Sequence, residues 1–393
     1  MPTTSPTTIT ALDQPLLRPV DLAGLRLPNR VVVAPTTRAR AENSGLAPTD
    51  LHVAHYARRA TAGLIVTEST LVSERATGQV NVPGIYSEEQ VAGWRRVTDV
   101  VHALGGRIVM QLWHAGAVSH PDHHDGRLPG GPSAVNPEQT VFTPTGPKAT
   151  VTPHEMSLAE IAQAVLDYAT AAANARRAGF DGVELPAHGV YLLPQFLSPR
   201  LNRRTDAYGG DRFRRRRFLF EVLDAVTAVW DGAPRVGVRL APYWNSGGPY
   251  AFDVELLPEY DELTAELGDR RIAYLHLLGP DLPGPHPTAA GSTAPGSTAL
   301  GSATAGSTAD RAAPDLSRLA RYRRLFAGPL IANNGFDRES ANAAVASGVA
   351  DAVSFARHFI ANPDLVTRFA LGREPAPGDP STYYAGGVRG YLD

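Results

Sequence analysis

Eight short, almost wholly apolar runs recur along the chain, and a longer amphipathic stretch follows each of them. Runs of this kind are typical of parallel strands buried on both faces. Eight strand–helix repeats predict a single (β/α)8 TIM barrel of α/β class over residues 16–393. A doubly wound sheet is the alternative, but it usually has fewer units, and no G-x-G-x-x-G follows the first run. The runs are 31–34, 64–67, 107–112, 180–185, 236–240, 273–278, 330–333 and 352–355.

Helical spacing of apolar residues marks the stretches between the runs. The clearest start is at Ser157, where Ser157 and Glu160 form an S-x-x-E capping box ahead of a periodic segment. The expected helices are 50–62, 88–104, 157–177, 211–230, 254–267, 316–326, 338–347 and 363–370.

Three stretches fall outside this repeat. The loop 119–154 after the third strand is long enough for a small hairpin or a lid. The segment 281–313 after the sixth strand contains GSTAPGSTALGSATAGSTA, which cannot bury a core and predicts a flexible insertion. It is either a flap that orders on substrate or, more simply, a loop without function. Residues 1–15 are predicted to be a disordered lead-in, and they have neither the basic nor the apolar region of a secretory signal.

Composition excludes several functions. The chain has no Cys, which removes disulfides, thiolate nucleophiles and cysteine-ligated metal centres. With 37 Lys and Arg against 39 Asp and Glu, the net charge is -2. This argues against binding to nucleic acid or to an acidic membrane surface through a basic patch. No stretch is apolar enough to span a membrane. A small-molecule substrate and, by default, a cytoplasmic location are expected.

Active sites of such barrels lie at the C-terminal ends of the strands. A Gly follows the seventh run and an Arg follows the eighth, at the usual phosphate-binding site of such barrels. Backbone N–H groups and a guanidinium bind a phosphate dianion well. Gln111 and Arg239 can hydrogen-bond a flat heterocycle, and Trp113 and Tyr191 add an aromatic wall. No metal site is predicted, because the nearby His114 has no carboxylate at ligand spacing.

Several long motifs in one order resemble the Old Yellow Enzyme family of FMN-dependent ene-reductases. They are LPNRVVVAPTTRARA, AGLIVTEST, PGIYSEEQVAGWRRVTDVVHALGGRIVMQLWHAG, FLSPRLNRRTDAYGG, IANNGFDRESA, FARHFIANPDL and STYYAGGVRGYLD. The resemblance covers about residues 16–393, apart from the Gly/Ser/Thr-rich insertion.

The resemblance implies non-covalent FMN at the top of the barrel, with NADPH or NADH as reductant. Thr37 would lie near the C4 carbonyl of the flavin, and an Arg near N1 would stabilise charge on the reduced ring. Hydride would pass from N5 to the β-carbon of an activated alkene, and Tyr191 would protonate the α-carbon. The implied FMN contacts are Pro35, Thr36, Thr37, Ser69, Gln111, Arg239, Asn333, Asn334, Gly335, Ala356 and Arg357, and the implied substrate contacts are Trp113, His188 and Tyr191.

The segment after the fourth strand departs from the family pattern H-x-A-[NH]-G-Y, whose two anchors hold the substrate carbonyl. An ungapped match places Pro186 and Gly189 at the anchors, and neither side chain can donate a hydrogen bond. A one-residue slip places His188 at the second anchor instead. His188 is therefore the candidate anchor, and a histidine that only caps a loop carbonyl is the competing interpretation. Ala117, Asn334 and Ala356 also replace residues usual in the family.

The rebuilt anchor leaves three functions open. The first is reduction of a conjugated carbonyl compound in a specialised biosynthetic pathway. The second is a flavin-mediated desaturation, isomerisation or rearrangement without nicotinamide turnover. The third is an FMN-binding protein that has lost catalysis, against which stands the joint presence of Tyr191, Thr37, Gln111 and Arg239. A monomer and a homo-oligomer are both compatible with the sequence.

Overall fold

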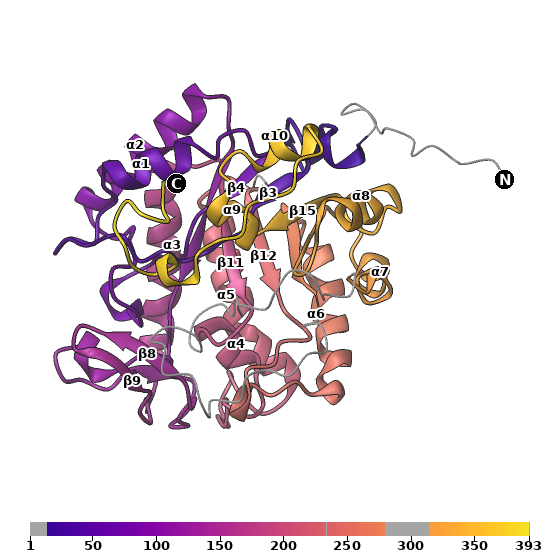
Figure 1. Ribbon diagram of the computed structural model, residues 1–393. Coiled ribbons are helices and arrows are strands. Elements are labelled where there is room, and N and C mark those ends of the chain that lie inside the picture. Colours follow the sequence, from indigo (N-terminus) through magenta and orange to yellow (C-terminus); the bar gives the residue numbers. More distant parts are fainter. Residues whose placement is uncertain (1–13, 233, 280–313, 393) are drawn as a thin grey trace.

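The computed structural model describes residues 14–232, 234–279 and 314–392. Its centre is a closed barrel of parallel strands, each hydrogen-bonded to the next, with β15 returning to β3 and β6 pairing with β11. This confirms the predicted (β/α)8 TIM barrel, shown in Figure 1. The barrel strands are β3 (Val31–Val33), β4 (Leu64–Val66), β6 (Ile108–Trp113), β11 (Gly182–Ala187), β12 (Val236–Leu240), β13 (Tyr274–Leu278), β14 (Leu330–Asn333) and β15 (Ala352–Phe355).

Helices surround the barrel where the periodicity predicts them, with changes at their ends. The first expected helix ends at Ala57 rather than at residue 62. The fifth, expected from residue 254, begins at Leu257, because Pro258 fixes its first turn and 254–256 forms a 3-10 turn. Two short helices, α4 and α9, were not predicted. The helices are α1 (Asp50–Ala57), α2 (Glu88–Ala103), α3 (Leu158–Arg177), α4 (Leu192–Leu197), α5 (Arg212–Ala228), α6 (Leu257–Asp269), α7 (Leu316–Leu325), α8 (Arg338–Ala346), α9 (Arg357–Ala361) and α10 (Leu365–Ala370).

Two apolar cores stabilise this arrangement. The larger lies between the strands and the surrounding helices. The smaller includes barrel-strand residues such as Leu64 and Ile331, together with the N-terminal hairpin of β1 (Val20–Leu22) and β2 (Leu25–Leu27). Leu22 and Leu27 of that hairpin are buried in this second core. Burial of apolar surface is the main source of stability here.

Close packing inside the barrel requires a glycine on β12. A Cβ on Gly237 would meet the ring of Tyr274 at 2.3 Å, a contact that real Cβ atoms do not make. The two residues are direct register partners on β12 and β13. Gly237 therefore makes room for the Tyr274 ring in the barrel interior, because the dense packing there would not let the ring move aside.

The loop after β6 carries the hairpin that its length predicts. Strands β8 (Thr140–Thr143) and β9 (Gly146–Ala149) pair antiparallel, and β7 (Gly130–Gly131) pairs with β10 (His154–Glu155). In Figure 1 the β8–β9 hairpin and α4 lie at the same end of the barrel. The short β5 (Thr70–Leu71) pairs with β6. The predicted flexible insertion, 281–313, lies outside the described residues.

The predicted lead-in, 1–15, also falls mostly outside them. Its last two residues do belong to the fold, because Gln14 is buried and its amide donates to the carbonyl of Phe369, and Pro15 begins a 3-10 turn. Within the described parts of the chain, no helix combines the length and apolarity needed to cross a membrane.

Two arginines after β3 bind the C-terminal tail. Arg38 donates to the carbonyls of Tyr383 and Gly390, and Arg40 donates to those of Thr382 and Gly387. Both guanidiniums also lie over the ring of Tyr391, at 5.3 and 5.2 Å from its centroid. Figure 1 shows this tail in yellow, ending beside α1 and α2. The loop after β3 and the last residues of the chain therefore form one packed unit.

Candidate active site

The candidate residues from the sequence lie at the C-terminal ends of the barrel strands. Pro35, Thr36 and Thr37 follow β3 after one intervening residue, Ala34, and all three are half-buried. Thr36 donates from Oγ1 to the carbonyl of Ala34 at 3.3 Å, which tightens the chain as it leaves the strand. The other candidates follow β4, β6, β11, β12, β14 and β15 or lie near their ends. Parallel strands in a barrel bring these ends to one rim.

A chain of hydrogen bonds joins two of these candidates to a residue that the sequence analysis did not select. Ser69 Oγ donates to Gln111 Oε1 at 3.1 Å, and Gln111 Nε2 donates to Glu184 Oε1 at 2.8 Å. Gln111 and Glu184 are register partners on β6 and β11. Gln111 is therefore held between a hydroxyl on one side and a carboxylate on the other.

The chain continues across the barrel through a buried pair. Glu184 Oε2 lies 2.8 Å from His276 Nδ1, and His276 Nε2 lies 2.7 Å from Ser354 Oγ. Both members of the pair are fully buried. Burial lowers the pKa of His276, so its ring is neutral. Burial alone would raise the pKa of Glu184, but His276, Arg239 and Gln111 stabilise its charge and bring that pKa below its usual value.

Arg239 is the cation of this rim. Its Nη2 donates to Asn333 Oδ1 at 2.7 Å, and Asn333 Nδ2 donates to the carbonyl of Ser354 at 2.9 Å. Its Nε is buried with no hydrogen-bond partner among the described residues. Burial lowers the pKa of Arg239, and the Glu184 carboxylate acts against that effect. A buried guanidinium with an unused donor is costly unless a ligand accepts from it.

Three aromatic side chains meet beside this polar layer. The rings of Trp113 and Tyr191 are perpendicular with centroids 5.5 Å apart, and those of His188 and Tyr191 are perpendicular at 5.7 Å. Trp113 Nε1 and His188 Nδ1 are buried, and neither has a hydrogen-bond partner within the described structure. Two unused polar atoms therefore flank one tyrosine.

The segment between β11 and α4 sets the position of that tyrosine. β11 continues through Pro186 to Ala187, two residues beyond the predicted end of the strand, and Gly189 then turns the chain with φ of +71°. The carbonyl of Val190 accepts from Gln195 Nε2 at 2.8 Å and from the Tyr250 hydroxyl at 3.0 Å. The structure thus places His188 beside Tyr191.

The predicted phosphate-binding residues lie on two neighbouring strands. Asn334 and Gly335 follow β14, and Ala356 and Arg357 follow β15 at the start of α9. Asn334 and Gly335 adopt φ of +86° and +77°. Asparagine tolerates this left-handed region better than most residues do, so Asn334 can replace the glycine that is usual in the family.

These residues fit an FMN. The pyrimidine edge of a flavin presents one N–H between two carbonyl oxygens, and the rim offers the acceptor Gln111 Oε1 and the unused donor Arg239 Nε. Half-buried Thr36 and Thr37 add hydroxyls. The loops after β14 and β15 are where barrels of this type hold a phosphate. The strongest support for such a ligand is Arg239 Nε, which is buried and has no hydrogen-bond partner among the described residues.

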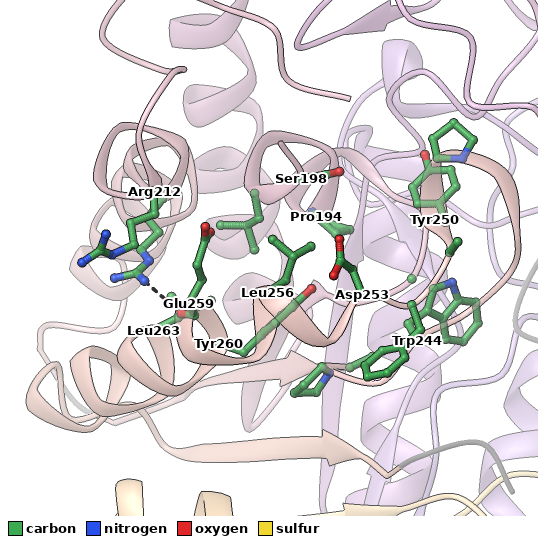
Figure 2. A pocket seen from close by; sticks show the side chains of 18 residues that line it. Pro194, Ser198, Arg212, Trp244, Tyr250, Asp253, Leu256, Glu259, Tyr260 and Leu263 are labelled. Carbon is green, nitrogen blue, oxygen red and sulfur yellow. Dashed lines mark hydrogen bonds between the residues drawn. The ribbon is translucent and has the colours of Figure 1, made fainter. Parts of the chain in front are cut away.

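A separate cavity of about 80 Å³ lies on the flank of the barrel, among α4, α5, α6 and the loop after β12. Figure 2 shows Trp244 and Tyr250 at one end of it and Arg212 and Glu259 at the other. None of the candidate residues from the sequence lines it, although Gly189 does. The cavity therefore adjoins the segment that carries His188 and Tyr191 but does not contain their side chains.

Sequence reasoning missed Glu184, His276 and Ser354. The available signal was a charged or polar residue inside an otherwise apolar strand, as in GVELPA and YLHLL. It also missed Gln195 and Tyr250, whose contacts with Val190 join distant segments. Within the described residues, no group of three or more histidine, aspartate or glutamate side chains could hold a metal ion.

Comparison with known proteins identifies the family. Residues 15–375 match the model of the NADH:flavin oxidoreductase / NADH oxidase family. A protein of Leishmania infantum named "probable flavin mononucleotide-dependent alkene reductase" is 38% identical, with 96% of each chain covered. Morphinone reductase in complex with tetrahydroNAD has a TM-score of 0.82 and 41% identity, again with 96% of each chain covered.

A third relative is the Old Yellow Enzyme homologue of Zymomonas mobilis, with a TM-score of 0.84 and 34% identity over 96% of this chain and 98% of that one. The match extends over nearly the whole chain, and the rim fits a flavin. The chain therefore belongs to the NADH:flavin oxidoreductase / NADH oxidase family and is an FMN-dependent oxidoreductase of the Old Yellow Enzyme type.

Proposed function

We propose that this oxidoreductase reduces a carbon–carbon double bond conjugated to a carbonyl group, with NADPH or NADH as the electron source. His188 holds the carbonyl oxygen of the substrate, and Tyr191 gives a proton to the α-carbon. Trp113 forms the wall beside them. The observation that carries this proposal is the buried, unpartnered Nδ1 of His188 next to the Tyr191 ring.

The environment of His188 suits a neutral hydrogen-bond donor. Burial lowers its pKa well below the usual value, and the charge of Arg239 acts in the same direction. The ring is therefore uncharged at neutral pH and carries one N–H. A buried donor without a partner gains more from a substrate carbonyl than a solvated one does.

The environment of Tyr191 suits a proton donor. Burial raises its pKa, as does Tyr384 of the C-terminal tail, so the phenol stays protonated across the physiological range. FMN, when bound, supplies the hydride that adds to the β-carbon. Tyr191 Oη then gives its proton to the α-carbon and is reprotonated from solvent. The net change is one hydride and one proton added across the double bond.

The anchor favours strongly activated substrates. In the family pattern two side chains hold the carbonyl, and loss of one such donor typically costs about 3 kcal/mol of transition-state stabilisation. Trp113 Nε1 is the only other unpartnered buried donor that contacts Tyr191 in the described structure, so it is our candidate for the second anchor. A rebuilt anchor of this kind supports a specialised biosynthetic role rather than general enone reduction.

An anaerobic spectroscopic experiment tests the proposal. FMN-loaded protein is mixed with NADPH or NADH, and bleaching of the flavin spectrum is followed by addition of activated alkenes. We expect prompt bleaching, and then reoxidation by an alkene bearing a conjugated carbonyl with formation of the saturated product.

Tyr191→Phe should bleach normally but reoxidise slowly, whereas the control Tyr260→Phe, in the flank cavity, should match the wild type. A flavin that does not bleach would contradict the proposal and direct attention to redox-neutral chemistry. Protein that retains FMN but neither bleaches nor converts any substrate would indicate a catalytically silent flavoprotein.

A further inference from the structure

We propose that Glu184 is a positioning residue for the flavin, because it fixes the orientation of the Gln111 amide and places a buried negative charge opposite Arg239. This inference rests on the proposed function, since it takes Gln111 and Arg239 as the residues that face the pyrimidine edge of FMN. It adds a residue that touches neither the flavin nor the substrate.

The first support is the donor and acceptor logic of the Gln111 amide. An ionised carboxylate only accepts hydrogen bonds, so Glu184 Oε1 requires the NH2 end of Gln111 at 2.8 Å. The carbonyl end must then lie on the other side, where Oε1 accepts from Ser69 at 3.1 Å. One of its lone pairs remains for the single N–H of a flavin pyrimidine. A neutral residue at position 184 would leave the amide free to turn over.

The second support is that the far oxygen of Glu184 is fixed as well. His276 is neutral, so its Nδ1 carries the proton and donates to Glu184 Oε2 at 2.8 Å. Its Nε2 then accepts from Ser354 Oγ at 2.7 Å. Both oxygens of the carboxylate are thus held, one on each side of the barrel interior. The carboxylate cannot rotate away from Gln111 without breaking both bonds.

The third support is the charge itself. Glu184 is fully buried, and the groups that interact with it are His276, Arg239, Gln111 and Tyr274. Arg239 is the cation among them, and its Nη2 donates to the Asn333 side chain rather than to a carboxylate. A buried charge is a poor device for stability, because a well-packed apolar residue usually does as well. We therefore assign the Glu184 charge to the ligand: it fixes the orientation of the Gln111 amide and tunes the reduction potential of the flavin.

The electrostatic consequence has a definite sign. A cation at the pyrimidine edge stabilises the reduced, anionic flavin, and a buried anion behind it opposes that effect. Removing the Glu184 charge should therefore favour reduced over oxidised FMN. The oxidised flavin should bind somewhat more weakly, because a neutral amide at position 184 can either accept from or donate to Gln111 and so no longer holds the Gln111 amide in one orientation.

Glu184→Gln tests the inference with little change of shape. The His276 tautomer can adapt to either orientation of the new amide, so both ends of that amide stay hydrogen-bonded and the interior stays packed. The readouts are the melting temperature, the dissociation constant of FMN and the midpoint potential of the bound flavin. We expect a folded protein whose affinity for reduced relative to oxidised FMN rises about tenfold, seen as a positive shift in the potential.

Ser354→Ala is the matched control, because it removes a hydrogen bond from the far end of the same chain without changing any charge. Its potential should equal that of the wild type. If Glu184→Gln fails to fold, the double variant Glu184→Gln/His276→Gln replaces it, since two neutral amides can bond to each other, and the same shift is expected.

The two possible failures are separable. A folded Glu184→Gln protein with unchanged FMN affinity and unchanged potential would overturn this inference while leaving the proposed reaction intact. Wild-type protein that binds FMN but does not reduce an activated alkene would overturn the proposed function instead. Because the readouts here are binding and potential, they require no substrate.

Discussion

The imidazole of His188 stands perpendicular to the phenol of Tyr191, with ring centroids 5.7 Å apart, and its Nδ1 is buried with no partner within the described structure. A donor and a protonated phenol side by side are what an enolate-like transition state requires, one for its oxygen and one for its carbon. The relationship arises although the usual anchor positions hold Pro186 and Gly189 in an ungapped match.

His188→Ala tests the anchor. Loss of one donor to developing oxyanion charge should lower kcat/KM for the alkene by about 100-fold, or ~3 kcal/mol. Binding of FMN should be unchanged. The exposed His102→Ala, which removes only a surface pair with Asp181, is the control and should leave turnover unaffected. Equal turnover by His188→Ala and the wild type would assign the histidine to loop structure alone.

The pH profile of alkene reduction tests the protonation states. The pKa of His188 lies well below 6.5 and that of Tyr191 lies above its usual value, both because of burial. Neither group should titrate between pH 6 and 9. The rate of the oxidative half-reaction should therefore not change with pH in this range through either residue. Rapid-mixing rates across this range measure it. An inflection near pH 6.5 that disappears in His188→Ala would show that the imidazole charges during the reaction.

Glu68 should make the stability of the fold depend on pH. Burial raises its pKa to about 7 from a usual value of 4.5, against the effect of the Arg38 backbone N–H that it accepts from. The folded state therefore holds a proton that the unfolded state has lost between these values. The stabilisation is complete below about pH 4.5 and is lost as the pH rises through about 7.

Glu68→Gln should abolish this contribution. Relative to the wild type, the variant should gain up to about 3 kcal/mol in free energy of unfolding between pH 5 and pH 8. Denaturant titrations of both proteins at several pH values measure the difference, in which titrations shared by the two proteins cancel. A constant difference across the range would mean that Glu68 does not titrate there.

Tyr391 should hold the C-terminal tail to the loop after β3. Its ring stacks on His55 at 3.9 Å and lies under both Arg38 and Arg40, and it is fully buried. Tyr391→Ala should lower the free energy of unfolding by about 3–5 kcal/mol, the usual range for a large buried aromatic. It should also weaken FMN retention, because Arg38 packs on this ring and directly follows Thr37 in the chain.

Tyr391→Phe is the matched control. The Tyr391 hydroxyl is buried with no partner among the described residues, so its removal should leave stability equal or slightly higher. Thermal melting with and without added FMN compares the two variants. Equal melting temperatures for Tyr391→Ala and Tyr391→Phe would show that the ring contributes nothing to the tail.

The barrel could be predicted because its strands are buried on both faces. That burial makes each strand an apolar run, and the run is visible without any tertiary information. The short helices α4 and α9 could not be predicted in the same way. They span 6 and 5 residues, too few for a helical periodicity to be recognised. Their apolar side chains, such as Phe196 and Phe359, are buried, so tertiary packing stabilises them.

The rim residues were predictable from the positions that follow each strand, but their partners were not. Gln111 and Arg239 stand out as polar residues near strand ends, whereas Glu184 and His276 are separated by 92 residues and meet only through the barrel. The left-handed turn at Asn334 suits its residue type, because asparagine tolerates that conformation.

The fold class, the family resemblance and the side chains near the strand ends can be read from the sequence. Local apolar patterns and motif order carry that information, since each depends on residues close together in the chain. The contacts of His188 with Tyr191, of Glu184 with Gln111 and His276, and of Arg38 with the C-terminal tail are visible in the folded structure and not in the sequence. Such contacts depend on strand register and on turns far apart in sequence, and distances of a few ångströms across a barrel follow from packing alone.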